Sequence, residues 1–168
     1  MQDLPFPDRH LVMAADGWLD LGLPGDALRE LERCSPAGRR TRIAANIAWR
    51  AHAERRDWPS ALAVAERLVS DAPDELGGWL HRSYALHELH RTEEAREALL
   101  PAVTRFPKEP ILRYNLACYA CRMGDLEAAR RWLRDVVRLK DVEFLKGLAK
   151  DDPDLATLRE EIAGWGPE

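Results

Sequence analysis

The chain has 168 residues, of which 46% are hydrophobic and 32% are charged. This balance excludes disorder over most of the chain and fits one folded unit with a buried core. The formal net charge is −4 at pH 7, and the arginines do not form a basic stripe, so we expect no nucleic-acid partner.

The first seven residues, 1–7, are predicted to be an N-terminal extension. They lack the basic stretch and apolar run of a secretory signal. No apolar segment of the sequence approaches the ~20 residues that a membrane-spanning helix needs, so we expect no membrane partner. The three cysteines are an odd number, which disfavours a disulfide framework and favours a reducing, cytoplasmic location.

Small residues recur along the chain at a fixed period. Ala27, Ala61, Ala95 and Ala129 follow one another at intervals of 34 residues. Alanine lets two crossing helices approach closely, whereas a larger side chain would force them apart at a cost of about 1 to 3 kcal/mol. A fixed period of this length indicates stacked helix-turn-helix repeats.

Other positions keep the same phase. Core positions are predicted on the second helices at Leu31, Ala65, Leu99 and Leu133. Proline disfavours helical geometry in the residue before it, so closing prolines are predicted at Pro73 and Pro107. Turns after first helices are predicted at Gly22 and Gly124, and helix starts at Pro59 and Thr92.

The first repeat departs from this pattern. Arg39 stands where a closing proline would be, and Pro36 comes early. We therefore expect a short second helix, followed by an irregular loop through Gly38. The tryptophans Trp18, Trp49 and Trp79 fall on apolar helix faces and are interpreted as packing residues.

The phase-locked alanines and prolines together resemble the tetratricopeptide-repeat family, over about Asp8 to Asp141. The resemblance implies an all-α fold, an α-solenoid of about four helix-turn-helix repeats with a C-terminal capping helix. The predicted repeats are residues 8–41, 42–75, 76–109 and 110–141.

Residues 142–168 are predicted to form capping helices and a tail. A short helix is expected from Phe144 to Ala149, and a final helix from the Asp152 cap to about Ile162. Apolar residues share one face of that final helix at Leu155, Leu158 and Ile162. Such a cap shields the end of a repeat array.

Two short motifs have spacings close to those of reactive or metal-binding sites. Cys118 and Cys121 have the spacing of a redox or zinc half-site, but no second cysteine pair exists and the segment is predicted to be helix interior. His87 and His90 are three residues apart, whereas a zinc protease helix needs four. We therefore predict no catalytic residue, no cofactor and no metal, and the protein is not expected to be an enzyme.

In tetratricopeptide arrays the first helix of each repeat lines a concave groove, so the resemblance implies a partner-binding groove there. The spacing of three or four residues within each helix places each set on one face. The predicted groove residues are Asn46, Arg50, His81, Tyr84, His87, Glu88, Tyr114, Asn115, Cys118 and Arg122. The first repeat would add Val12, Asp16 and Asp20.

Arg82 lies beside this set, where the family usually has an apolar packing residue. Either the helix is rotated slightly or Arg82 has a specific partner. The residue pairs with which some family members grip a chaperone's terminal carboxylate are not present, since Val12 and Asp16 occupy the places of the first pair.

The leading hypothesis is a protein-protein interaction module or scaffold that binds an extended peptide or a helix of a partner. A narrower alternative is a dedicated chaperone for a secreted or assembly substrate, and an enzyme is the least favoured alternative. Exposed apolar surface on the first repeat or on the cap would also allow a homo-oligomer.

Overall fold

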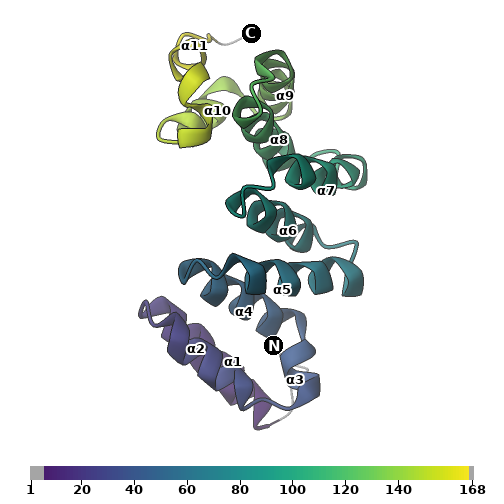
Figure 1. Cartoon of the computed structure of the whole chain (residues 1–168), viewed down its shortest axis with the longest axis vertical. Helices are drawn as coiled ribbons and strands as arrows, with labels where there is room; N and C mark the ends of the chain where they lie inside the picture. The colour runs from purple at the N-terminus through teal and green to yellow at the C-terminus, as the bar shows by residue number, and fades with distance from the viewer. Residues whose placement is uncertain (1–5, 167–168) are drawn as a thin grey trace. The chain divides into compact units, whose positions relative to one another are not determined.

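The computed structural model describes residues 6–166, and every regular element in that range is a helix (Figure 1). Of the predicted N-terminal extension, residues 1–5 lie outside the described part. None of the described helices is long and apolar enough to cross a membrane. The helices form two compact units, residues 1–85 and residues 86–168.

Unit 1, residues 1–85, packs its helices in sequential pairs, with α1 against α2 and α4 against α5 (Figure 1). Its complete helices are α1 (Asp8–Asp20), α2 (Pro24–Glu32), α3 (Pro36–Arg40), α4 (Arg42–Glu54) and α5 (Trp58–Asp71). The helix α6 (Leu76–Glu88) begins in unit 1 and ends in unit 2. The core of α1, α2 and α4 is formed by Val12, Ala15, Leu19, Ala27, Leu31, Cys34, Ala44, Ile47 and Ala51.

Unit 2, residues 86–168, repeats this pairing, with α8 packed along α9. Its helices are α7 (Thr92–Arg105), α8 (Pro110–Arg122), α9 (Leu126–Leu139), α10 (Val142–Ala149), the 3₁₀ helix η1 (Pro153–Leu158) and α11 (Arg159–Ala163). Fully buried leucines fill its core at Leu99, Leu112, Leu116, Leu133, Leu145 and Leu155. Burial of each leucine contributes about 1.5 to 3 kcal/mol.

The predicted core phase is confirmed. The alanines at Ala27, Ala61, Ala95 and Ala129 are all 0% exposed. The second-helix positions Leu31, Ala65, Leu99 and Leu133 are buried as well.

The ends of the helices follow the same period. As predicted, α5 and α7 end ahead of Pro73 and Pro107, at Asp71 and Arg105. A left-handed residue follows each of α1, α4, α6 and α8, with φ of 72° at Gly22, 55° at Arg56, 61° at His90 and 80° at Gly124. These four positions are 34 residues apart, so the turn recurs even where the sequence has no glycine.

The first repeat is only partly as expected. Its second helix is short, as predicted, because α2 ends at Glu32. The prediction of an irregular loop through Gly38 was wrong, since Gly38 lies inside the short helix α3. Ser35 caps α3 by accepting a hydrogen bond of 3.0 Å from the Gly38 N–H.

A buried carboxylate holds that cap in place. Asp8, only 3% exposed, accepts hydrogen bonds from the Ser35 N–H at 2.8 Å and from the Ser35 hydroxyl at 2.5 Å. These hydrogen bonds lower the pKa of the Asp8 carboxyl. A Cβ added at Gly38 would overlap the Asp8 side chain, so the glycine makes this close approach possible.

The predicted final helix is present but begins as a 3₁₀ turn. Asp152 caps it, as expected, by accepting a hydrogen bond of 2.9 Å from the Asp154 N–H. Side chains three residues apart share one face of a 3₁₀ helix, and Leu155 and Leu158 are 0% and 2% exposed there. The predicted apolar face, completed by Ile162, is confirmed.

Candidate functional site

In unit 1, four of the predicted groove residues lie together on α4 and on the first part of α6. We call the set Asn46, Trp49, Arg50, His81 and Tyr84 the α4–α6 surface. Its centre is a stacked pair, in which the rings of Trp49 and His81 are 3.8 Å apart and inclined by only 11°. The tryptophan, interpreted from sequence as a packing residue, is half-buried and also shapes this surface.

The polar atoms beside this stack are ordered by hydrogen bonds. Asn46 Nδ2 donates to the Arg42 carbonyl at 2.9 Å, which turns Asn46 Oδ1 toward His81 Nε2 at 3.1 Å. An amide oxygen only accepts, so the His81 proton resides on Nε2. Burial lowers the pKa of His81 to about 4, so the imidazole is neutral near pH 7.

Tyr84 supplies the exposed aromatic part of the surface. Its ring meets Trp49 and Trp58 edge-on, with centroid distances of 6.2 and 5.7 Å. The residue nevertheless remains 43% exposed. A tyrosine held from behind in this way loses little conformational entropy when a partner packs on it.

Arg50 is already paired at the edge of the surface. Its guanidinium lies 3.1 Å from Asp16 Oδ1 and 3.7 Å from Asp20 Oδ1. One arginine between two carboxylates leaves a net negative charge, so this edge favours a basic partner group over a carboxylate. Of the other first-repeat candidates, Val12 is fully buried and therefore lines no surface.

Arg82 has a partner within its own helix. Its guanidinium carbon lies 4.9 Å from the centre of the Trp79 ring, a cation–π contact. Burial lowers the pKa of Arg82, and the Glu66 carboxylate opposes that shift. The arginine thus takes the place of an apolar packing residue by covering an aromatic ring.

In unit 2, the predicted groove residues of α8 are covered by the chain itself. The Tyr114 hydroxyl donates a hydrogen bond to Asp152 Oδ2 at 2.6 Å, and the Cys118 thiol donates to the same oxygen at 3.6 Å. These two side chains are only 5% and 4% exposed. The expectation that they line an open groove is therefore corrected, because Asp152 at the start of η1 lies over them.

A second acidic residue of the cap engages two further candidates. Asp154 Oδ2 lies 2.9 Å from His87 Nε2, and Asp154 Oδ1 lies 3.6 Å from Arg122 Nε. The other ring nitrogen of His87, Nδ1, is 3.1 Å from the Thr92 hydroxyl. Both imidazole nitrogens of His87 therefore face polar atoms of unit 2.

The remaining two candidates, Glu88 and Asn115, are half-buried in unit 2. Sequence reasoning missed Asp152 and Asp154, which it interpreted only as the start of the cap. A usable signal was present, because Asp152 lies 34 residues beyond Cys118, as Arg50 lies 34 beyond Asp16. In both pairs, residues one period apart are in contact.

The three cysteines are free thiols and are buried. Burial raises the pKa of the Cys118 thiol, and the nearby carboxylates of Asp152 and Asp154 raise it further. Cys121 and Cys34 have raised pKa values for the same first cause, burial. A protonated, buried thiol is a poor nucleophile, which fits the prediction that the Cys118 and Cys121 spacing is not a redox motif.

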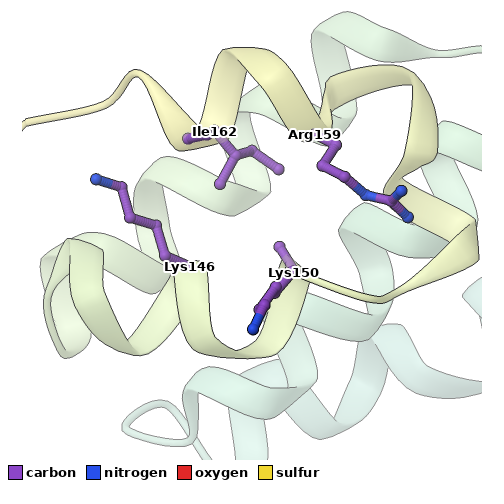
Figure 2. Close-up of a pocket in the computed structure, with 6 residues that line it drawn as sticks. Lys146, Lys150, Arg159 and Ile162 are labelled. Carbon is purple, nitrogen blue, oxygen red and sulfur yellow. The ribbon is translucent and has the colours of Figure 1, made fainter.

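A separate pocket opens between α10 and α11 of unit 2 (Figure 2). Its apolar lining includes Ala149, Ile162 and Ala163. Lys146 of α10, Lys150 directly after that helix and Arg159 at the start of α11 also line it (Figure 2). Two of these cations are engaged, since Lys146 pairs with Glu143 at 3.6 Å and Arg159 donates to the Asp152 carbonyl at 3.1 Å.

Comparison with known protein families identifies the family to which this chain belongs. A tetratricopeptide-repeat family model matches residues 48–110 and again residues 82–144, which together span more than half of the chain. The chain belongs to the tetratricopeptide-repeat family. No curated protein sequence matches it.

Solved tetratricopeptide structures have the same fold. TTC0263, a thermophilic tetratricopeptide protein of Thermus thermophilus, is 21% identical, with a TM-score of 0.72 over 93% of this chain and 86% of that chain. A MamA crystal structure is 14% identical, with a TM-score of 0.73 over 80% and 78% of the two chains. MamA residues 41 to the end, from Desulfovibrio magneticus RS-1, are 20% identical, with a TM-score of 0.70 over 79% and 75%.

Membership gives the function in general terms. Tetratricopeptide-repeat folds generally serve as protein-protein interaction modules, and the family is typically non-enzymatic.

Proposed function

We propose that this tetratricopeptide protein binds an extended segment of a partner protein on the α4–α6 surface of unit 1. The observation that carries the proposal is the ordered stack of Trp49 on His81 with Tyr84 exposed beside it. A rigid aromatic surface of this kind supplies contact area at low entropic cost, as binding hot spots do.

The charges at its edge define the chemistry of the partner. Asp16 and Asp20 have side chains that are 50% and 73% exposed, and Arg50 neutralises only one of the two charges. A segment with an apolar side chain for Tyr84 and a nearby lysine or arginine for these carboxylates would match both parts. The neutral His81 imidazole adds no opposing positive charge.

The α8 face supports the same choice by contrast. Tyr114 and Cys118 are buried against Asp152, so a partner would have to displace the cap to reach them. Displacing the cap would expose Leu155 and Leu158, each of which contributes about 1.5 to 3 kcal/mol by burial. The α4–α6 surface needs no such displacement.

The test is selection of peptides from an unstructured random library against the full chain, followed by calorimetry with the best binder. We expect Tyr84→Ala to weaken binding at least about tenfold, because an aromatic anchor is lost. The matched control is Leu100→Ala, which removes a side chain of similar exposure, 39%, from the second helix α7. Equal affinities for the wild-type and Tyr84→Ala proteins would contradict the proposal.

A further inference from the structure

A cluster of metal-ligating side chains in unit 2 is independent of the proposed partner surface. Cys118 Sγ and one carboxylate oxygen each from Asp152 and Asp154 all lie within 4.8 Å of one another. The thiol is 4% exposed and is aimed at Asp152, and both carboxylates are half-buried. The donors come from α8 and from the segment that opens η1, so two separate elements converge on one point.

A histidine outside this group of donors holds one of the two carboxylates. His87 Nε2 is 2.9 Å from Asp154 Oδ2. Its Nδ1 is held 3.1 Å from the Thr92 hydroxyl. Metal-ligating carboxylates are commonly held from outside by hydrogen bonds of this kind. The Thr92 contact fixes the orientation of the His87 ring.

The spacing suits a small divalent ion. Bonds of about 2.0 to 2.3 Å to a tetrahedral ion place neighbouring ligand atoms about 3.3 to 3.8 Å apart. The thiol and the Asp152 carboxylate are 3.6 Å apart, within that range. The widest separation in the triad, at most 4.8 Å, would close with a contraction of about 1 Å.

The local charge also favours a cation. Two carboxylates meet here. Of the two arginines beside them, Arg122 lies 3.6 Å from Asp154 with a side chain that is 54% exposed, and Arg159 donates to the backbone carbonyl of Asp152. The exposed, flexible Arg122 side chain can turn toward solvent when an ion takes its place. Tyr114 would keep its 2.6 Å hydrogen bond to Asp152 and orient that ligand from behind.

We propose that Cys118, Asp152 and Asp154 bind a zinc-type divalent transition-metal ion, with His87 orienting Asp154. The sulfur donor beside the two oxygens selects this class over magnesium and calcium, which prefer oxygen alone. The ion would take the place of the Cys118 thiol proton, which would be released to solvent, and would join α8 to η1 and so fasten the cap to the last repeat. This differs from the sequence-based expectation of no metal, which did not bring Asp152 and Asp154 to Cys118.

The test uses the full chain, reduced and freed of metal by a chelator, with Co²⁺ as a spectroscopic probe. We expect a thiolate-to-cobalt charge-transfer band that stoichiometric Zn²⁺ abolishes. Zn²⁺ should also raise the melting temperature, because an ion that binds only the folded state stabilises it. Asp154→Asn should weaken Co²⁺ binding about tenfold or more.

Cysteine variants assign the band. Cys118→Ser should abolish it, whereas Cys34→Ser, at a buried cysteine of unit 1, should leave it intact. Circular dichroism checks that each variant is folded. If the Cys118→Ser protein is not folded, the affinity of the Asp154→Asn protein for Co²⁺ tests the site instead. No charge-transfer band with excess Co²⁺ would overturn the proposal, and so would a band that survives in folded Cys118→Ser protein or an affinity unchanged in Asp154→Asn.

Discussion

His81 shows how one residue of the α4–α6 surface depends on its surroundings. It stacks on Trp49 at 3.8 Å and its Nε2 proton is donated to Asn46. Burial there lowers its pKa from 6.5 to about 4, because the charged form would lose its hydration. The histidine is thus a neutral packing residue that also orders an asparagine at the surface.

This pKa predicts a pH dependence of stability. Between about pH 6.5 and pH 4 the unfolded chain binds a proton at His81 that the folded chain does not, so the free energy of unfolding falls as pH falls through that window. We expect a loss on the order of 2 to 3 kcal/mol from this residue. Urea unfolding at a series of pH values measures it.

A variant separates His81 from the carboxylates. His81→Gln retains an N–H donor for Asn46 but does not titrate. The unfolding free energy of this variant should therefore change less with pH over the same window. Asp8 and Asp57 have pKa values below their ordinary range, so their contributions are lost at lower pH than that of His81. Identical slopes for the wild-type and His81→Gln proteins between about pH 6.5 and 4 would refute this explanation.

At the scale of the elements, the left-handed turn after each first helix is the most regular feature. It falls at Gly22, Arg56, His90 and Gly124, with positive φ at all four. Glycine adopts this conformation without strain, whereas a side chain costs about 1 to 2 kcal/mol. Two of the four turns therefore carry a residue that is not the most stable choice.

Replacing Arg56 by glycine should stabilise the protein. We expect Arg56→Gly to raise the free energy of unfolding by about 1 kcal/mol, measured as a higher urea midpoint at an unchanged m-value. Gly124→Ala should lower it by a similar amount, because alanine is strained at a φ of 80°.

A helical glycine provides the control for this prediction. Gly147 lies within α10 with open space where a Cβ would be, so Gly147→Ala should be stabilising. If Gly124→Ala and Gly147→Ala changed stability in the same direction, backbone conformation would not explain the turns.

Much of the fold follows from the 34-residue period. The alanines and leucines predicted to be core are buried, and the helices end ahead of the predicted prolines. The helix around Gly38 could not be predicted, because it depends on Asp8, which lies 27 residues before Ser35 and holds its cap. Local propensity at Gly38 favours a loop, and a long-range hydrogen bond to a buried carboxylate overrides it.

At the scale of the whole chain, the predicted groove residues of the first helices differ in solvent exposure between the two units. In unit 1, Tyr84 is 43% exposed, whereas in unit 2 Tyr114 is 5% exposed beneath Asp152. Helical spacing predicted that Asn46 shares a face with Arg50, but not that Asn46 and Trp49 of α4 meet His81 of α6. It could not predict that the cap covers the α8 face, because that depends on a contact between residues 38 positions apart, Tyr114 and Asp152.

The most direct test of partner binding on unit 1 is hydrogen–deuterium exchange of the full chain with and without the selected peptide. We predict that the peptide slows amide exchange in α4 and in the part of α6 up to Ala85, and leaves α8 and η1 unchanged. Ordering of the partner segment against the α4–α6 surface would produce this pattern. Protection confined to α8 and η1, with α4 unaffected, would contradict the account and place the partner on the cap.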